Sequence, residues 1–202
     1  MSYPSESESS ELPSSEARIP GKPKALDLFC GAGGASMGIF RAGFDVTGVD
    51  IAPQPRYPFE FRQGDALAAD LRGYDFVWAS PPCQRYTRAQ NAAKNAHAHP
   101  DLVAPIRAKL EAWGGPWIIE NVVGAPLVNP LTLCGLAFGL NVKRHRLFES
   151  NCFLLAPPCP SHDEDYFVIF GHEVRNRRHA GRKKEQHRRR AQGNGHRLDD
   201  SR

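Results

Sequence analysis

The sequence predicts an α/β fold, a doubly wound, mostly parallel, Rossmann-like sheet with one hydrophobic core. Two observations indicate it. Short apolar runs alternate with segments of helical period, as in chains that build parallel strands joined by crossover helices. Several of these runs end in a glycine turn, a proline pair or an acidic residue, at the strand ends where such sheets bind their ligands.

Length and composition fit one such domain. At 202 residues the chain leaves little room for a second globular core. It has no apolar run long enough to cross a membrane and no secretory leader at its first residues, so we expect a cytoplasmic protein without membrane partners. Its five cysteines, an odd number at irregular spacing, argue against a disulfide framework.

One group of cysteines and histidines could be arranged as a zinc pattern. Its members are Cys152, Cys159, His162 and His172. The gap between the two cysteines matches no tight metal knuckle, and the segment between them is ordinary proline-containing loop. We therefore predict no metal site.

Two tails flank the predicted domain, which we place at residues 25–170. Residues 1–24 are mainly Ser, Glu and Pro, with too few apolar side chains to offset the entropy of ordering, and we predict disorder there. From Arg175 onward, eleven Arg or Lys and three acidic residues give a local net charge of +8, which leaves −4 for residues 1–174 out of the total of +4. We expect residues 171–202 to be a basic, disordered tail that contacts phosphate.

The first predicted strand, residues 25–29, runs into a glycine turn at residues 30–34 and then a helix that ends at Gly43. Glycine allows positive φ and the close approach of a ligand, and the helix N-terminus offers unpaired N–H groups. Tight packing between a strand and a helix also needs glycine. The turn alone therefore leaves both interpretations open.

The second predicted strand, residues 44–50, ends at Asp50, about twenty residues after the glycine turn. An acidic side chain at this place can accept both hydroxyl groups of a ribose, so an adenosine-containing ligand is the natural choice. A short strand at residues 59–62 leads to Asp65. This residue can cap a predicted helix over residues 66–72, meet an adenine amino group, or do both.

The next apolar run, residues 74–78, stops at a Pro-Pro pair that cannot donate hydrogen bonds to a sheet, and Cys83 follows directly. A free cysteine is most often a small buried apolar residue, whereas one at a strand end can also be a nucleophile. Residues 85–100 are polar and basic without a period, and we interpret them as a loop.

A predicted helix begins near Pro100, carries apolar residues on one face and ends at Gly114. It leads to a strand over residues 117–122 that carries Glu120. A carboxylate beside a core strand costs several kcal/mol unless a partner satisfies it, so packing alone explains Glu120 poorly.

The last part of the predicted domain contains two strand candidates. Arg144 and Arg146 alternate along the first, residues 141–150, and would project to one side. A pair of surface charges is the usual alternative. Residues 166–170 form the second candidate.

Four reactive residues, Asp50, Asp65, Cys83 and Glu120, thus lie at or just past the carboxyl ends of predicted strands. At these residues the chain resembles the cytosine-C5 DNA methyltransferases, over roughly residues 25–150. The resembling stretches, in the family's motif order, are DLFCGAGG at 27–34, Asp50-Ile51, Asp65, SPPCQ at 80–84, Glu120-Asn121-Val122 and Arg144-x-Arg146.

The resemblance implies a methyltransferase catalytic domain at residues 25–170 that uses S-adenosyl-L-methionine. Cys83 would be the nucleophile, Glu120 would hold the base, and Arg144 and Arg146 would orient the base and the backbone. The cofactor would contact Phe29, Gly31, Gly33, Asp50, Ile51, Asp65, Ala66 and Pro82. DNA would contact Gln84, Arg85, Arg88 and Lys94.

The implied reaction is methyl transfer to C5 of cytosine in DNA. A thiolate that adds to C6 makes C5 nucleophilic, which requires a thiol pKa below the free value of about 8.5. The target base has to flip out of the duplex to reach the thiol. The same resemblance suggests a restriction-modification or phage setting, with or without a separate specificity partner.

Two features keep other hypotheses open. Only 52 residues follow Ser150, without the family's late motifs, and Val142 stands where the family often has Gln. One alternative is a catalytically silent remnant that binds nucleic acid or the methyl donor. Another is a cytosine-C5 methyltransferase that acts on RNA.

Overall fold

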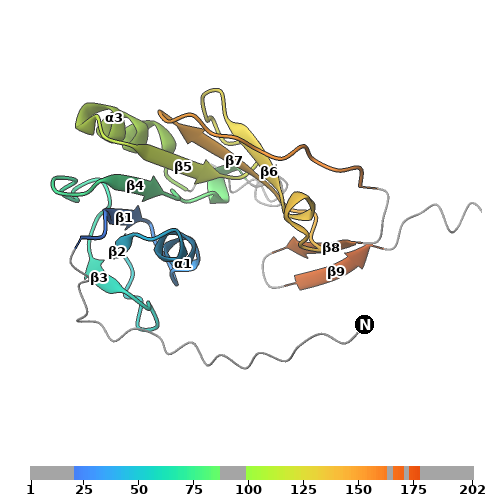
Figure 1. Cartoon of the computed structure of the whole chain (residues 1–202), viewed down its shortest axis with the longest axis horizontal. Helices are drawn as coiled ribbons and strands as arrows, with labels where there is room; N and C mark the ends of the chain where they lie inside the picture. Colours follow the sequence, from blue (N-terminus) through green and yellow to red (C-terminus); the bar gives the residue numbers. More distant parts are fainter. Residues whose placement is uncertain (1–20, 87–98, 163–165, 171–172, 178–202) are drawn as a thin grey trace, which may run out of the picture. The chain divides into compact units, whose positions relative to one another are not determined.

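The computed structural model describes residues 21–86, 99–162, 166–170 and 173–177 (Figure 1). The elements up to the middle of the chain are β1 (Lys24–Leu28), α1 (Gly34–Arg41), β2 (Asp45–Asp50), β3 (Glu60–Gln63), β4 (Phe76–Ala79), the 3-10 turn η1 (Gln84–Tyr86) and α3 (Val103–Trp113). Then follow β5 (Trp117–Asn121), β6 (Leu131–Cys134), the 3-10 turn η3 (Gly135–Phe138), β7 (His145–Ser150), β8 (Tyr166–Phe170) and β9 (Glu173–Arg177).

The main sheet has seven strands in the order β3-β2-β1-β4-β5-β7-β6. The pairs β3·β2, β2·β1, β1·β4 and β4·β5 are parallel, and β7 runs antiparallel to β5. Because the order reverses between β1 and β4, the carboxyl ends of these strands form a crevice at a topological switch point. The predicted fold class, a doubly wound and mostly parallel Rossmann-like sheet, is confirmed.

The chain divides into two compact units. The first unit consists of Met1–Thr132 and Arg146–Ala156, and the second of Leu133–His145 and Pro157–Arg202. The second unit contains the small antiparallel sheet β8-β9. The predicted boundaries of the domain, residues 25 and 170, stay a prediction.

The core of the first unit is built from strand and helix residues whose apolar period the sequence shows. Leu28, Val77 and Ile119 come from neighbouring strands and are fully buried, and the apolar face of α3 adds Ile106 and Leu110. Burying one such side chain stabilises the fold by about 1.5–3 kcal/mol. A smaller cluster combines Ala25, Ile39 and Val46.

The predicted helix over residues 66–72 is wrong, because this segment forms only short turns. The Asp65 carboxylate accepts the N–H of Leu67 at 2.9 Å, and that of Asp70 accepts the N–H of Arg72 at 3.0 Å. Such bonds from Asp to the backbone two residues on compete with helix formation. The apolar side chain of Leu71 is buried without a helix.

Two other expectations need correction. The strand predicted over residues 141–150 begins only at His145, so Arg144 precedes it. Strand β9 lies within residues 171–202, where we predicted a tail without secondary structure, and it pairs with β8 through backbone hydrogen bonds that need no apolar period. Residues 1–20, 171–172 and 178–202 lie outside the described part.

Among the described residues, no helix combines the length and the apolar character needed to cross a lipid bilayer.

Candidate functional site

The glycine turn between β1 and α1 has the conformation that its sequence requires. Phe29, Gly31 and Gly33 have φ of 61°, 50° and 88°. A Cβ on Gly33 would lie 2.9 Å from Pro58, so only glycine fits there, whereas a Cβ on Gly31 would meet nothing within 4 Å. The backbone at Gly31 therefore faces open space that a ligand can enter.

The Asp50 carboxylate ties this turn to the end of β2. One oxygen accepts the N–H of Gly31 at 2.9 Å, and the other accepts the N–H of Ala52 at 2.9 Å. A carboxylate has about four acceptor positions, so these two bonds leave capacity for further donors. The next residue, Ile51, is 75% exposed, an unusual exposure for a large apolar side chain.

The other predicted cofactor residues follow the neighbouring strands. Ala66 is buried, and the Asp65 carboxylate lies on the surface in the turn described above. Pro82 is half-buried in the loop after β4. These residues and the glycine turn all follow the carboxyl ends of β1, β2, β3 or β4 in the first unit.

A buried polar network lies next to the turn, and the sequence analysis missed it. The Ser36 hydroxyl donates to one carboxylate oxygen of Asp27 and lies 2.7 Å from the Tyr57 hydroxyl, and the other Asp27 oxygen has no hydrogen-bond partner. Desolvation, and then the charge of Asp50, raise the pKa of Asp27 to about 7, although the Ser36 bond opposes the shift. Tyr57 lies in the loop between β2 and β3, and no sequence motif there indicates that it joins this network.

Two cysteines lie near the carboxyl edge of the sheet, at Cys30 and Cys83. Desolvation, and then the charges of Asp27 and Asp50, raise the pKa of the Cys30 thiol to about 12. A thiol with this pKa forms almost no thiolate at neutral pH, so Cys30 is a structural residue. Cys83 is half-buried, directly after the loop that leaves β4.

Asn121 holds the loop that carries Cys83. Its amide Nδ2 donates to the carbonyl oxygen of Pro81 at 3.0 Å, and its Oδ1 accepts the N–H of Val122 at 2.8 Å. Asn121 is 1% exposed, and its bond to Pro81 is shielded from water. This bond joins the end of β5 to the loop after β4. The Glu-Asn-Val stretch was the available signal, but we assigned a role only to its glutamate.

Glu120 and Arg146 form an ion pair at the same edge. Arg146 Nε lies 2.8 Å from Glu120 Oε1, and both side chains are about a quarter exposed or less. Arg146 comes from β7, which lies antiparallel to β5, so the sheet itself brings the two together. Behind them, Arg107 of α3 makes a bidentate pair with the buried Glu149 of β7, at 2.5 and 2.7 Å.

Three of the remaining predicted residues, Arg144, Gln84 and Arg85, belong to the described part of the chain. Arg144 is exposed and belongs to the second unit, and its carbonyl accepts the N–H of Gly135. Gln84 is exposed in η1, and Arg85 donates to the carbonyl of His99 at 3.1 Å. Arg88 and Lys94 lie outside the described residues.

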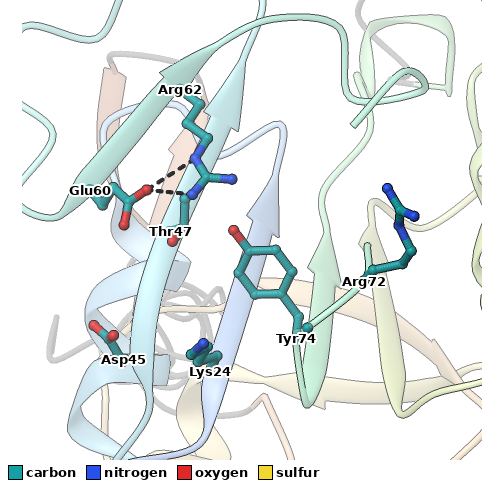
Figure 2. A pocket seen from close by; sticks show the side chains of 8 residues that line it. Lys24, Asp45, Thr47, Glu60, Arg62, Arg72 and Tyr74 are labelled. Carbon is teal, nitrogen blue, oxygen red and sulfur yellow. Dashed lines mark hydrogen bonds and ion pairs between the residues drawn. The ribbon is translucent and has the colours of Figure 1, made fainter. Parts of the chain in front are cut away.

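One pocket of the first unit lies at the opposite edge of the sheet (Figure 2). Lys24, Asp45 and Glu60 line it, and each is the first residue of its strand. Charged groups dominate its wall, and the Glu60–Arg62 ion pair lies along β3 on this wall. None of the predicted site residues lines this pocket, so it is separate from the candidate site.

Comparisons with known proteins agree with a methyltransferase but do not define the substrate. No protein-family model matches the chain. The chain is 32% identical over 126 residues to the Type II methyltransferase M.XorII of Xanthomonas oryzae pv. oryzae, a match that covers 51% of this chain but 29% of that protein.

Similar solved structures include two methyltransferases. The Entamoeba histolytica methyltransferase EhMeth has 14% identity and a TM-score of 0.46, over 69% of this chain and 58% of that chain. The Burkholderia thailandensis 1,6-didemethyltoxoflavin-N1-methyltransferase, solved with bound S-adenosylhomocysteine, has 15% identity and a TM-score of 0.42, over 64% of this chain and 71% of that chain. Both likenesses are distant, and the fold class depends on the strand order described above.

Proposed function

We propose that this chain transfers a methyl group from S-adenosyl-L-methionine to C5 of cytosine in DNA, with Cys83 as the nucleophile. The observation that carries the proposal is the Asn121–Pro81 hydrogen bond. It fixes the loop that presents Cys83 against the strand that presents Glu120. A thiol and a carboxyl group, 37 positions apart in the sequence, thereby follow neighbouring strand ends.

The residues around the glycine turn fit the cofactor. Asp50 retains acceptor capacity for the ribose hydroxyls, and Ile51 offers an exposed apolar surface for the adenine ring. The open space at Gly31 allows a ligand to approach the backbone. When bound there, S-adenosyl-L-methionine supplies an electrophilic methyl group.

The chain's own residues would activate the base. The Cys83 thiolate adds to C6 of a flipped cytosine, and the electron pair of the C5–C6 double bond moves so that C5 becomes nucleophilic. Glu120 in its protonated form donates a hydrogen bond to N3 and accepts one from the exocyclic amino group, so the proton it shares with N3 neutralises the negative charge that develops on the ring. Arg146 Nε, 2.8 Å from Glu120 Oε1, orients this side chain. After C5 is methylated, a base removes its proton and Cys83 leaves.

Transfer of radiolabelled methyl groups tests the proposal. Wild-type protein, S-adenosyl-L-methionine with a labelled methyl group and unmethylated duplex DNA should give label in DNA as 5-methylcytosine. Cys83→Ser should abolish it, whereas Cys152→Ser, which changes an exposed thiol outside the site, should not. Label in RNA but not in DNA would refute the DNA substrate, and labelling by Cys83→Ser at the wild-type rate would refute the thiol mechanism.

DNA with 5-fluorocytosine at target positions tests the same step independently. Fluorine at C5 cannot leave as a proton, so the adduct between Cys83 and C6 should persist and be retained on a denaturing gel. Absence of the adduct in protein that methylates ordinary DNA would exclude covalent catalysis by Cys83. Cofactor binding without transfer to any nucleic acid would favour the silent remnant.

A further inference from the structure

The second unit contains four side chains whose ligand atoms meet at one place. They are Cys134 at the end of β6, His145 at the start of β7, and Cys159 and His162 in the segment between β7 and β8. Their sulfur and Nε2 atoms all lie within 4.8 Å of one another. The candidate methyl-transfer site uses none of them.

Three of the distances between ligand atoms in this cluster are close to those of a tetrahedral metal site. Cys134 Sγ lies 3.6 Å from His162 Nε2, His145 Nε2 lies 3.4 Å from Cys159 Sγ, and Cys159 Sγ lies 3.2 Å from His162 Nε2. With Zn–S near 2.3 Å and Zn–N near 2.0–2.1 Å, a tetrahedron places its ligand atoms about 3.3–3.8 Å apart. Two sulfur and two imidazole ligands are a donor set that zinc prefers.

Hydrogen bonds between the four side chains account for the cluster less well. His162 Nε2 contacts both sulfur atoms, but one ring nitrogen carries either a single proton or a single lone pair. It can therefore make one well-directed bond to one of the two sulfurs. A cation between the four atoms satisfies all of these contacts at once.

The backbone brings two of the ligands together independently of their side chains. The N–H of Gly135 donates to the carbonyl of Arg144 at 3.1 Å, so the neighbouring residues Cys134 and His145 lie side by side. A Cβ on Gly135 would lie 2.6 Å from the carbonyl oxygen of Val142, which makes glycine necessary at this position. The other two ligands form a Cys-x2-His pair that a short loop can present to one ion.

The segment that carries Cys159 and His162 has little apolar packing among its described residues. Both hydrophobic clusters found among the described residues consist entirely of first-unit side chains. Residues 151–162 contain no helix or strand, and nearly all of their side chains are exposed. Small units without a sufficient core commonly depend on a structural metal.

We propose that Cys134, His145, Cys159 and His162 bind one Zn²⁺ ion that fixes the segment after β7 to the β6–β7 turn. Four protein ligands close the coordination sphere and leave no position for substrate, so the site is structural. The proposal departs from our sequence-based prediction of no metal, and the metal content of the protein decides between the two. Of the zinc pattern considered there, Cys159 and His162 belong to the cluster, Cys152 lies beside Asn151 instead, and His172 is outside the described residues.

Metal content of the full chain tests the proposal. Protein purified without chelator should contain about one zinc per chain by atomic emission. Cys159→Ser and His162→Ala should each lose most of it. Cys159 is exposed, so its substitution removes no core contact, and Cys152→Ser and Cys83→Ser, both outside the cluster, should retain the metal.

Cobalt provides a readout that does not depend on the variants folding. Wild-type protein, stripped of metal under reducing conditions and titrated with Co²⁺, should bind one equivalent. The expected spectrum has the intense visible bands of a tetrahedral site and the near-ultraviolet thiolate-to-cobalt bands. The proposal is wrong if reduced wild-type protein takes up neither Zn²⁺ nor Co²⁺. It is equally wrong if the bound metal is unchanged in both ligand variants.

Discussion

The two units of this chain are stabilised by different chemistry. In the first unit, strands and α3 bury Leu28, Val77, Ile106, Leu110 and Ile119 in a continuous apolar cluster. Among the second-unit residues whose burial is described, Cys134 is the only buried apolar residue. The Cys134 side chain lies among the sulfur and imidazole groups of the four-residue cluster and not in a packed apolar core.

The difference shows what each unit requires to present a functional site. A sheet with an apolar core is stable by itself, so it can carry polar groups such as Asp27 and Asn121 in its interior. A unit whose described residues include no apolar cluster needs cross-links between distant parts of the chain. Removal of metal, a change of pH and core substitutions should therefore affect the two units differently.

Removal of metal should affect the second unit alone. With a strong zinc chelator, we expect the amides of Lys143 and Phe167, which bond to the carbonyls of Phe167 and Asn141, to exchange with solvent more than 100-fold faster. The amides of Cys30 and Val77, which belong to the first unit, should keep their protection. Hydrogen exchange measured by mass spectrometry or NMR would show it. Equally faster amide exchange in both units would contradict the inference that metal stabilises only the second unit.

The buried carboxyl group of Asp27 should make the first unit less stable as the pH rises. Its folded pKa of about 7 lies above the ordinary aspartate value of 3.8, so the folded state holds its proton more tightly than the unfolded state. Below pH 4 both states are protonated and the group costs nothing. Between pH 4 and pH 7 stability falls, by about 4 kcal/mol once both states are ionised.

Asp27→Asn isolates this contribution, because it removes the ionisable group and keeps the shape. The free energy of unfolding, measured in urea from pH 4 to pH 8 for both proteins, should fall more steeply for the wild type. If the free energy of unfolding changes with pH in the same way in both proteins, ionisation of Asp27 does not affect stability.

A matched pair of leucines tests where the apolar core lies. Leu110 of the first unit is fully buried, whereas Leu140 of the second unit is 58% exposed. Leu110→Ala should lower the free energy of unfolding by about 3 kcal/mol, since it removes buried methyl groups and leaves a cavity. Leu140→Ala should change it by less than about 0.5 kcal/mol. Similar losses in the two variants would mean that the second unit has a core of its own.

Much of the first unit could be predicted from the sequence, because its strands are buried and its turns carry glycine or proline. The apolar pattern places four features at or just past strand ends, and the structure has them there: the glycine turn, Asp50, Cys83 and Glu120. The helix expected after Asp65 failed because two aspartates bond to the backbone ahead of them. The spacing of apolar residues does not reveal this competition between side-chain and helical hydrogen bonds.

The metal cluster was missed for a different reason. Two of its members, Cys134 and His145, are eleven positions apart and meet through the pairing of β6 with β7 and of Gly135 with Arg144. Spacing between cysteines therefore pointed to Cys152, which is exposed and lies outside the cluster. Contacts that depend on pairing between distant backbone segments are not visible in local spacing.

The smallest effect on stability, yet one specific to the proposed reaction, should come from Asn121. Asn121→Leu has a similar volume and adds no charge, but it removes the donor to the Pro81 carbonyl and the acceptor for the N–H of Val122. We expect a loss of about 1–3 kcal/mol in stability, because a buried acceptor is left unpaired. The kcat of methyl transfer should fall more than the KM for DNA rises, since the loop carrying Cys83 would lose its anchor to β5. Zinc content should stay at its wild-type value because the change lies in the first unit. If kcat is unchanged although the variant is less stable, the Asn121 bond serves folding only and does not position the thiol.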